Sequence, residues 1–267
     1  MSNDINMFGW NSSSYGYVDA CKRAVNDDEF FERFKDDPMY RVVLEHLDPG
    51  QGSYYLECIR RINPRLVIEL AKFSINDTLG KPKDIFPIKY SDGKQVLITP
   101  STIRYVKVLA DLLLEFGSLD GMKIIEIGGG YGGQALIISQ ECNFDSYHLI
   151  DLEDPVNLAK KYLNYFKIEN IGVYTPDALP DMDFDLVVSN YAFSEVAKST
   201  QDLYIDKVLS RCARGYITWN NENPDDQWGE TPYDYEPLTK RLGEFHTLRE
   251  GKEDAPGSSH PIIIWGK

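Results

Sequence analysis

The sequence contains few cysteines, and none of them are paired at a metal-binding or redox spacing. Its 267 residues include four, which are widely separated: Cys21, Cys58, Cys142 and Cys212. Because no Cys-x-x-Cys motif occurs, neither a disulfide framework nor a zinc site is indicated. We therefore expect reduced thiols and a cytoplasmic protein.

Long hydrophobic runs are also missing. The longest, such as Leu112–Leu114 with its neighbours and Ile262–Trp265, fall far short of the ~20 residues that a membrane-spanning helix needs. The segment Met1–Asp4 has no basic stretch followed by an apolar one, so no signal peptide is expected. Hydrophobic residues still make up 42% of the chain and aromatics 12%, which is enough for an ordinary core and excludes global disorder.

Basic residues are scarce relative to acidic ones. The chain has 28 Lys and Arg against 42 Asp and Glu, a formal net charge of −14 at pH 7. The imbalance is uneven, because residues 1–120 carry 15 basic and 18 acidic groups whereas residues 121–267 carry 13 and 24. A surface of this sign repels phosphate groups, so we expect neither a nucleic-acid partner nor a membrane partner.

The hydrophobic pattern divides the chain near residue 100. Residues 1–99 form a mainly helical N-terminal region, with helical patterns spread over residues 26–72. Alternation on both sides of an Asp-Gly pair predicts a hairpin near 86–98. Residues 100–267 have a different, regularly alternating pattern, and we treat them as a second domain.

In that second domain, strand-like and helix-like segments alternate after an opening helix that ends at Gly117. Strands are predicted at 122–127, 146–150, 171–174, 184–189, 214–219, about 244–249 and 261–265. Helices are predicted at 131–141, 154–166, about 200–212 and 232–242. Such alternation is typical of an α/β fold, with a parallel sheet covered by helices on both faces.

A glycine-rich turn follows the first predicted strand. The run from Glu126 to Gly133 has five glycines in its last six positions and leads into a predicted helix. Glycines let a ligand approach the main chain, and a helix start presents free N–H groups. Gly128, Gly130 and Gly133 match the dinucleotide fingerprint. With Glu126 in front, the run also matches acidic-x-Gly-x-Gly-x-Gly, ending at Gly132.

Acidic residues stand at the ends of three predicted strands. Glu126 suits a cationic ligand such as the amino group of S-adenosylmethionine, although an ordinary turn with a solvent-exposed Glu gives the same pattern. Asp151 could accept both hydroxyls of a ribose, or simply start the next helix. Asp177 could contact an adenine amine or lie in a polar loop. The cofactor-binding candidates are these three acids, the turn residues Gly128, Gly130, Tyr131 and Gly132, and Arg104.

Several runs together resemble a known family. They are Glu126–Gly133, Ile150–Leu152 and Ser189–Glu195, with Asn76-Asp77, Arg104-Tyr105 and Gly215–Ile217. In these runs, over residues 75–267, the chain resembles the sugar O-methyltransferase family of bacteria and large viruses, which are class I S-adenosylmethionine-dependent methyltransferases. The resemblance implies a Rossmann-like sheet of order 3-2-1-4-5-7-6 with strand seven antiparallel. It also implies S-adenosylmethionine as the cofactor and a sugar hydroxyl as the acceptor.

Candidate catalytic residues gather at one edge of this expected sheet. Ligands bind beyond the carboxyl ends of parallel strands, and an antiparallel last strand begins at the same edge. This places His260 near Glu195 as candidate proton acceptors, with Asn190 beside them. The ordinary pKa of histidine, ~6.5, leaves it neutral near pH 7. The alternatives are a strand-edge imidazole for His260 and a carboxylate that favours a helix start for Glu195.

Other polar and aromatic residues at this edge are candidates for binding. Tyr191, Asn220 and Trp219 could contact a sugar, since flat aromatic faces suit sugar rings and polar groups fix orientation. The alternative is that the aromatics pack a long loop. Arg104 could pair with the methionyl carboxylate or a substrate acid, or lie on the surface. The polar loop at 220–232 is long enough to act as a lid.

The sequence leaves three functions open. The first is sugar O-methylation, with a small-molecule or glycan acceptor. The second is an NAD(P)-dependent sugar dehydrogenase or epimerase, which would share the glycine fingerprint and Asp151, although no Tyr-x-x-x-Lys follows the fingerprint. The third is a non-catalytic cofactor-binding subunit. No spacing demands a metal, since the acidic run at 181–185 fits a solvated turn. The N-terminal third could cover the site or pair with a second copy.

Overall fold

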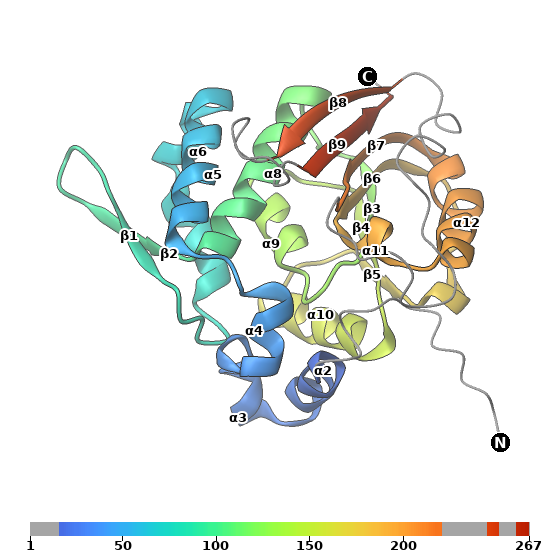
Figure 1. The fold of residues 1–267 in the computed structure, drawn as a ribbon, viewed down its shortest axis with the longest axis horizontal. Coiled ribbons are helices and arrows are strands. Elements are labelled where there is room, and N and C mark those ends of the chain that lie inside the picture. The colour runs from blue at the N-terminus through green and yellow to red at the C-terminus, as the bar shows by residue number, and fades with distance from the viewer. Residues whose placement is uncertain (1–15, 221–244, 251–259, 267) are drawn as a thin grey trace.

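The computed structural model describes residues 16–220, 245–250 and 260–266, and the structural statements below concern these residues. Its centre is a seven-stranded sheet of order β5-β4-β3-β6-β7-β9-β8 (Figure 1). The strands are β3 (Lys123–Ile127), β4 (Ser146–Ile150), β5 (Ile171–Tyr174), β6 (Phe184–Asn190), β7 (Cys212–Thr218), β8 (Phe245–Glu250) and β9 (His260–Trp265).

The direction of one strand distinguishes this sheet. The pairings among β3, β4, β5, β6 and β7 are parallel, whereas β9 runs antiparallel to both β7 and β8. Counted from β3, the order is 3-2-1-4-5-7-6 with the seventh strand antiparallel. The expected Rossmann-like class I methyltransferase sheet is therefore confirmed.

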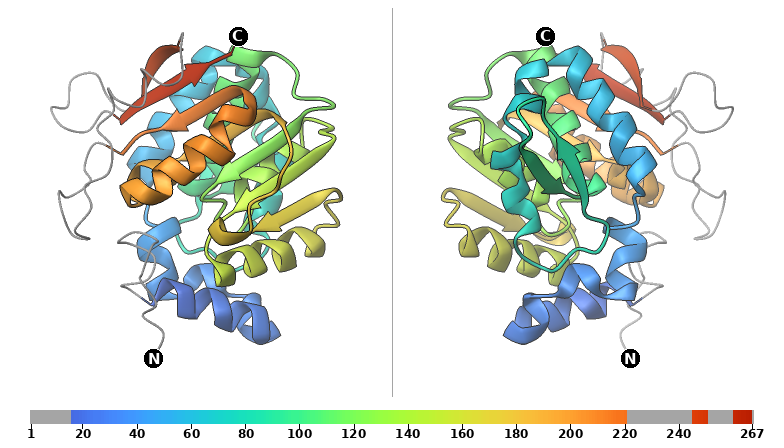
Figure 2. Two further views of the ribbon diagram at one scale, coloured as in Figure 1. Left: turned by 90° about the vertical axis from the view of Figure 1, so that its right-hand side faces the viewer. Right: turned by 90° about the vertical axis from the view of Figure 1, so that its left-hand side faces the viewer.

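The sheet separates two hydrophobic cores. On β3, Ile124 belongs to one core while Ile125 and Ile127 belong to the other, because successive side chains of a strand point to opposite faces. The core of Ile124 is covered by α8 (Pro100–Phe116), α9 (Gly133–Ser139) and α10 (Glu153–Tyr165). The opposite face carries α11 (Ala192–Glu195) and α12 (Lys198–Lys207) (Figure 2). The predicted helix at 232–242 lies outside the described residues.

The N-terminal region is helical, as predicted. Its helices are α2 (Tyr17–Asn26), α3 (Asp28–Phe31), α4 (Pro38–Leu44), α5 (Pro49–Ile62), α6 (Pro64–Ile68) and α7 (Leu70–Phe73), with 3-10 turns η1 (Phe34–Asp36) and η2 (Ser74–Asp77). Asp27 and Asp37 cap α3 and α4 by accepting backbone N–H groups of the first turns. Helix α2 lies against α10, and α5 lies along α8 (Figure 1). The sequence analysis did not predict α2.

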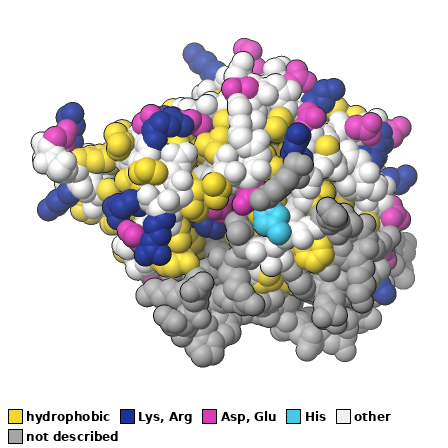
Figure 3. Space-filling view, turned by 90° about the horizontal axis from the view of Figure 1, so that it is seen from above, with side chains coloured by type: hydrophobic (Ala, Val, Ile, Leu, Met, Phe, Trp, Pro, Cys, Tyr) yellow, Lys and Arg dark blue, Asp and Glu magenta, His cyan; other side chains and the backbone are white. Residues whose placement is uncertain are grey.

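A hairpin extends from this region. Strands β1 (Phe86–Lys89) and β2 (Gln95–Ile98) pair antiparallel, which confirms the prediction at 86–98. Gly93 has a φ of 85° in the turn, and the N–H of Tyr90 donates to the carbonyl of Lys94 (2.9 Å). Seen from above, the hairpin projects from the body and carries charged and hydrophobic side chains (Figure 3).

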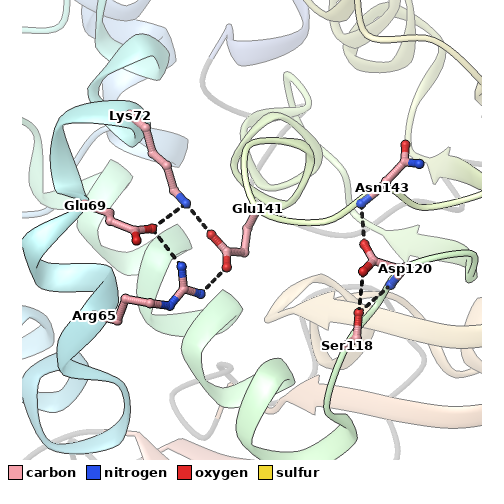
Figure 4. Close-up of polar contacts among 7 residues, drawn as sticks. All are labelled: Arg65, Glu69, Lys72, Ser118, Asp120, Glu141 and Asn143. Atoms are coloured by element: carbon pink, nitrogen blue, oxygen red, sulfur yellow. Dashed lines mark hydrogen bonds and ion pairs between the residues drawn. The ribbon is translucent and has the colours of Figure 1, made fainter.

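The two regions share a core and a network of ion pairs. Buried residues of the N-terminal helices and of the α8–α10 face form one continuous hydrophobic cluster. At its margin, Arg65 and Lys72 each contact both Glu69 and Glu141, which joins α6 and α7 to the end of α9 (Figure 4). None of the helices in the described ranges is long and apolar enough to cross a membrane.

Candidate active site

The glycine-rich turn lies at the carboxyl edge of the sheet, between β3 and α9. The N–H of Gly128 donates to the carbonyl of Ile150 at the end of β4 (2.8 Å). Gly128 has a φ of 77°, and a Cβ atom there would lie 2.0 Å from the Cβ of Ala192, so no larger residue fits without movement. The turn is thus packed directly against the segment that follows β6.

Asp151 is held against this turn. Its Oδ2 accepts the N–H of Gly130 (2.9 Å) and its Oδ1 accepts the N–H of Leu152 (2.8 Å). Desolvation raises the pKa of Asp151 to about 6, although both N–H groups act to lower it. A carboxylate has about four lone-pair sites, so acceptor capacity remains for ribose hydroxyls. Ribose binding by Asp151 stays a prediction.

Two predicted cofactor residues have their side chains in the interior. Glu126 is 3% exposed and accepts a hydrogen bond from the Tyr147 hydroxyl (2.9 Å), and desolvation raises its pKa to about 8. The alternative of a solvent-exposed Glu126 is therefore wrong. Tyr131 is fully buried, with its hydroxyl 2.9 Å from Asn76 Nδ2 and its ring 4.3 Å from Lys35 Nζ. At Tyr131 only the backbone can face a ligand bound at the turn.

The remaining two cofactor candidates differ in exposure. Asp177 follows β5 in the short turn η3 (Pro176–Ala178) and is exposed. Arg104 lies in the first turn of α8 and is 7% exposed, so the alternative of a surface arginine is wrong. Its guanidinium carbon lies 5.5 Å from the centroid of the Tyr191 ring. Arg104 is thereby directed toward the end of β6, where the catalytic candidates lie.

The structure brings the predicted catalytic residues together from distant parts of the chain. Asn220 Nδ2 donates to Glu195 Oε1 (2.8 Å), and the Asn220 N–H donates to Ser194 Oγ (2.8 Å). The rings of Tyr191 and His260 meet edge to face, with centroids 5.2 Å apart. Desolvation raises the pKa of Glu195, while Asn220 and the charges of His260 and Arg104 act to lower it. A carboxyl with a raised pKa is a stronger base than an ordinary glutamate, which suits it to accept a proton.

Tyr191 occupies a strained backbone position in this cluster. Its φ is 70° and its ψ is −42°, a conformation that residues with a Cβ atom rarely adopt. The position is held because its N–H donates to the carbonyl of Thr218 (3.0 Å) and its carbonyl accepts the N–H of Ser194 (3.0 Å). Strain of this kind is found preferentially at functional sites and costs about 1–3 kcal/mol.

The side chains of Asn190 and Trp219 differ in their contacts. The Oδ1 atom of Asn190, at the end of β6, is buried and has no hydrogen-bond partner within the described part of the chain. An unpaired buried acceptor is costly, which is typical of a group that meets a ligand. Trp219 is 6% exposed and packs 6.1 Å from the Phe193 ring in the second core. Its ring therefore supports the site from behind and offers no open face to a sugar.

The lid predicted at 220–232 lies, apart from Asn220, outside the described residues. The acidic run at 181–185 is described, and there Asp181 and Asp183 form ion pairs with Arg211. These contacts agree with a solvated turn. Across the ranges that the structure describes, no group of three or more His, Cys, Asp or Glu side chains is arranged to hold a metal ion.

The N-terminal helices bring two residues to the turn, Tyr17 and Leu44, which were not predicted from the sequence. A Cβ atom on Gly130 would lie 2.9 Å from Leu44 Cδ1 and 3.9 Å from the Tyr17 hydroxyl. Glu45 directly follows Leu44 and is 6% exposed. The spacing of buried residues in α2 would have indicated an amphipathic helix, but no local signal places α2 or the end of α4 over a turn that lies far along the chain.

Comparisons with known proteins give similarities among solved structures. The chain is similar to magnesium protoporphyrin IX methyltransferase from Synechocystis PCC 6803 with bound SAH, at 16% identity and a TM-score of 0.46, over 60% of this chain and 80% of that one. It is similar to an rRNA methylase from Streptococcus thermophilus, at 16% identity and a TM-score of 0.43, over 60% of this chain and 94% of that one.

A third similar structure was determined with a sugar. It is the N-terminal domain of EvdMO1 in the presence of SAH and D-fucose, at 13% identity and a TM-score of 0.40, over 54% of this chain and 75% of that one. No protein-family model matches the chain, and no curated protein matches its sequence. These identities and TM-scores are too low to transfer a substrate or a reaction, so the function is argued from the site.

Proposed function

We propose that this chain is an S-adenosylmethionine-dependent methyltransferase that methylates a hydroxyl group of a sugar. One observation carries the proposal. The glycine-rich turn with Asp151 and the cluster of Glu195, Asn220 and His260 meet at the same carboxyl edge of a class I methyltransferase sheet. The proposed cofactor site and the two proposed proton acceptors would therefore lie at one edge of the sheet.

The residues at this edge fit the cofactor. Asp151 retains acceptor capacity for ribose hydroxyls. At the turn, Gly128 is partly exposed, whereas Gly130 is buried beneath Leu44. Arg104 would face the methionyl carboxylate, and Asn190 Oδ1 is a buried acceptor that has no hydrogen-bond partner among the described residues. When bound, S-adenosylmethionine would supply a methyl group on a positively charged sulfur.

The chain itself would supply the proton acceptor. A sugar hydroxyl is a poor nucleophile until its proton leaves, and a positioned base contributes about 10²–10⁴-fold to such a reaction. Glu195 and His260 are the two groups placed to take that proton. Asn220 fixes the Glu195 carboxylate by its 2.8 Å hydrogen bond, and the Tyr191 ring fixes the face of His260. The acceptor oxygen would thus be held in line with the methyl group.

The nature of the acceptor follows from polarity and charge. Asn190, Tyr191 and Asn220 offer amide groups and one aromatic ring, which suits a polyhydroxylated ligand. The net charge of −11 over residues 121–267 disfavours a phosphate-bearing acceptor, so a neutral sugar or a glycan end is preferred. The resemblance in Ser189–Glu195 points to the same class of substrate.

A nicotinamide-dependent enzyme is the second candidate. It would share the glycine fingerprint and Asp151, but dinucleotide-binding sheets have the order 3-2-1-4-5-6. Here the antiparallel strand β9 is inserted between β7 and β8, which does not match that order. The sheet therefore favours the methyltransferase over the dehydrogenase.

Two measurements test the proposed function. Calorimetric titration with S-adenosylmethionine and with NAD should show binding of the first alone. Mass spectrometry of reactions with S-adenosylmethionine and a panel of neutral sugars and glycan ends should then show a gain of one methyl group. Tight NAD binding without S-adenosylmethionine binding would contradict the proposal. Cofactor binding without transfer to any acceptor would favour the non-catalytic subunit.

A further inference from the structure

One buried acid of the N-terminal helices has no role in the site as described above. Glu45 follows the last residue of α4 and is 6% exposed, yet its Oε1 atom has no hydrogen-bond partner among the described residues. An unsatisfied buried carboxylate oxygen is costly for a folded protein. Glu45 therefore requires an explanation.

The position of Glu45 is fixed from two directions. Its neighbour Leu44 packs over the glycine-rich turn, where a Cβ atom on Gly130 would lie 2.9 Å from Leu44 Cδ1. The carbonyl of Leu44 accepts a hydrogen bond from Ser101 Oγ at the start of α8 (3.3 Å). The Ser101 hydroxyl also acts on the Glu45 carboxyl itself. Leu44 is thus held between the turn and the first turn of α8, and Glu45 follows it directly.

The nearest buried lysine does not satisfy Glu45. Lys35 Nζ donates to the carbonyl of Asn76 (2.5 Å) and to the Tyr162 hydroxyl (3.3 Å), and it lies 4.3 Å from the centroid of the Tyr131 ring. The hydrogen bonds of this ammonium group are therefore directed to other partners. Glu45 Oε1 remains available to a different cation.

Glu45 and Arg104 place one negative and one positive group near the start of α8. Arg104 follows Ser101 by one helical turn in α8 and is directed toward Tyr191. Burial raises the pKa of Glu45, while the charge of Lys35 and, less strongly, that of Arg104 lower it. An α-amino acid group carries the complementary charges, an ammonium and a carboxylate.

We infer that Glu45 binds the α-ammonium group of the cofactor's methionyl portion, while Arg104 faces its carboxylate. The inference rests on the proposed function and adds to it a residue from the N-terminal helices. These helices would then form part of the cofactor site in addition to covering it. An arriving ammonium group would also provide the hydrogen bond that Oε1 lacks.

The test compares two ligands in one variant. 5′-Methylthioadenosine keeps the nucleoside and the sulfur of the cofactor but lacks the amino-acid portion. Glu45→Gln should weaken binding of S-adenosylmethionine by about 10- to 100-fold, the loss of one charge-assisted hydrogen bond, and leave binding of 5′-methylthioadenosine within about twofold. Glu57→Gln, on the exposed side of α5, is the matched control and should change neither affinity.

The outcomes separate the inference from the proposed function. Equal weakening of both ligands would show a structural role for Glu45 and overturn the inference, and so would no change in either. In both cases binding by the wild type would leave the proposed function intact. A wild type that binds neither ligand would overturn the proposed function and the inference with it. If Glu45→Gln does not fold, Glu45→Asp, which retracts the carboxylate by one methylene group, gives the same comparison.

Discussion

Asn220 donates a 2.8 Å hydrogen bond to Glu195, a residue that lies 25 positions earlier in the chain. This bond joins the end of β7 to α11, across the carboxyl edge of the sheet. It orients a carboxylate whose pKa is raised by desolvation and lowered, to a smaller extent, by the charges of His260 and Arg104. The relative positions of the two strand ends therefore decide where the candidate base stands.

Removal of the Glu195 charge should impair catalysis without impairing cofactor binding. We expect Glu195→Gln to lower kcat by about 10²- to 10⁴-fold, the contribution of a positioned base. Gln can still accept the hydrogen bond from Asn220, so the fold of this segment should persist. The affinity for S-adenosylmethionine, measured by calorimetry, should change little. A variant with full activity would show that Glu195 is not the base.

The pH dependence of the reaction tests the same residue from another side. A base must be deprotonated, and the pKa of Glu195 is raised by desolvation. Activity should therefore fall as the pH drops through this raised pKa, at higher pH than for an ordinary glutamate. If Glu195→Gln no longer shows this fall in activity at low pH, whereas His260→Ala still shows it, the fall is caused by protonation of Glu195. The reverse result would show that the fall is caused by protonation of His260.

The strained backbone of Tyr191 gives a prediction about stability. Tyr191→Ala and Tyr191→Gly remove the same ring contacts, but only glycine adopts a φ of 70° without strain. We expect the glycine variant to have the higher free energy of unfolding, by about 1–3 kcal/mol, in urea denaturation. Equal stability of the two variants would contradict the strain, since the comparison cancels the loss of the ring.

Burial of Glu126 should make stability depend on pH. Its pKa is raised to about 8 in the folded protein, mainly by desolvation, whereas an unfolded glutamate titrates near its ordinary value. Between these values the folded state holds a proton that the unfolded state has released. The free energy of unfolding should therefore fall as the pH rises toward 8, by at most about 1.4 kcal/mol per pH unit from this residue.

The variant Glu126→Gln isolates that contribution. It keeps an acceptor for the Tyr147 hydroxyl and cannot ionise. The free energy of unfolding is measured for the wild type and the variant at pH 6 and at pH 8. Between these two values it should fall more for the wild type than for Glu126→Gln. A difference between the two proteins that stays constant would show that Glu126 ionises no later in the folded protein than in the unfolded one.

The sequence predicted the sheet well because each strand is a local apolar run bounded by turns. The parallel strands, the hairpin near 86–98 and the turn at Gly128 all follow from short-range patterns. The convergence of Glu195, Asn220 and His260 required the order of the strands, which came from the resemblance. Once that order was fixed, the carboxyl edge selected the same residues that the structure brings together.

The contribution of the N-terminal helices could not be predicted in this way. Leu44 reaches the glycine-rich turn through packing between segments about 85 residues apart, and no local pattern encodes such a contact. The interior position of Tyr131 has the same cause, because its ring joins an aromatic cluster with Phe34 and Tyr40. The sequence indicated a ligand-binding turn at Tyr131 but not the direction of its side chain.

The close packing of Gly128 against Ala192 gives the sharpest prediction about the turn. A Cβ atom on Gly128 would lie 2.0 Å from the Ala192 Cβ, so Gly128→Ala combines a steric clash with a positive φ of 77°. Gly93→Ala is a matched control, because Gly93 also has a positive φ, of 85°, but no atom lies within 4 Å of the added methyl group. In urea denaturation we expect Gly128→Ala to lose about 1–3 kcal/mol more than Gly93→Ala.

The double variant Gly128→Ala with Ala192→Gly separates the clash from the strain. It removes the methyl group that the new Cβ would strike, so part of the lost stability should return. The strain of the positive φ should remain, leaving a loss similar to that of Gly93→Ala. A double variant that is no more stable than the sum of the two single changes predicts would show that Gly128 and Ala192 are not in contact. That result would contradict the close packing of the glycine-rich turn against the segment after β6.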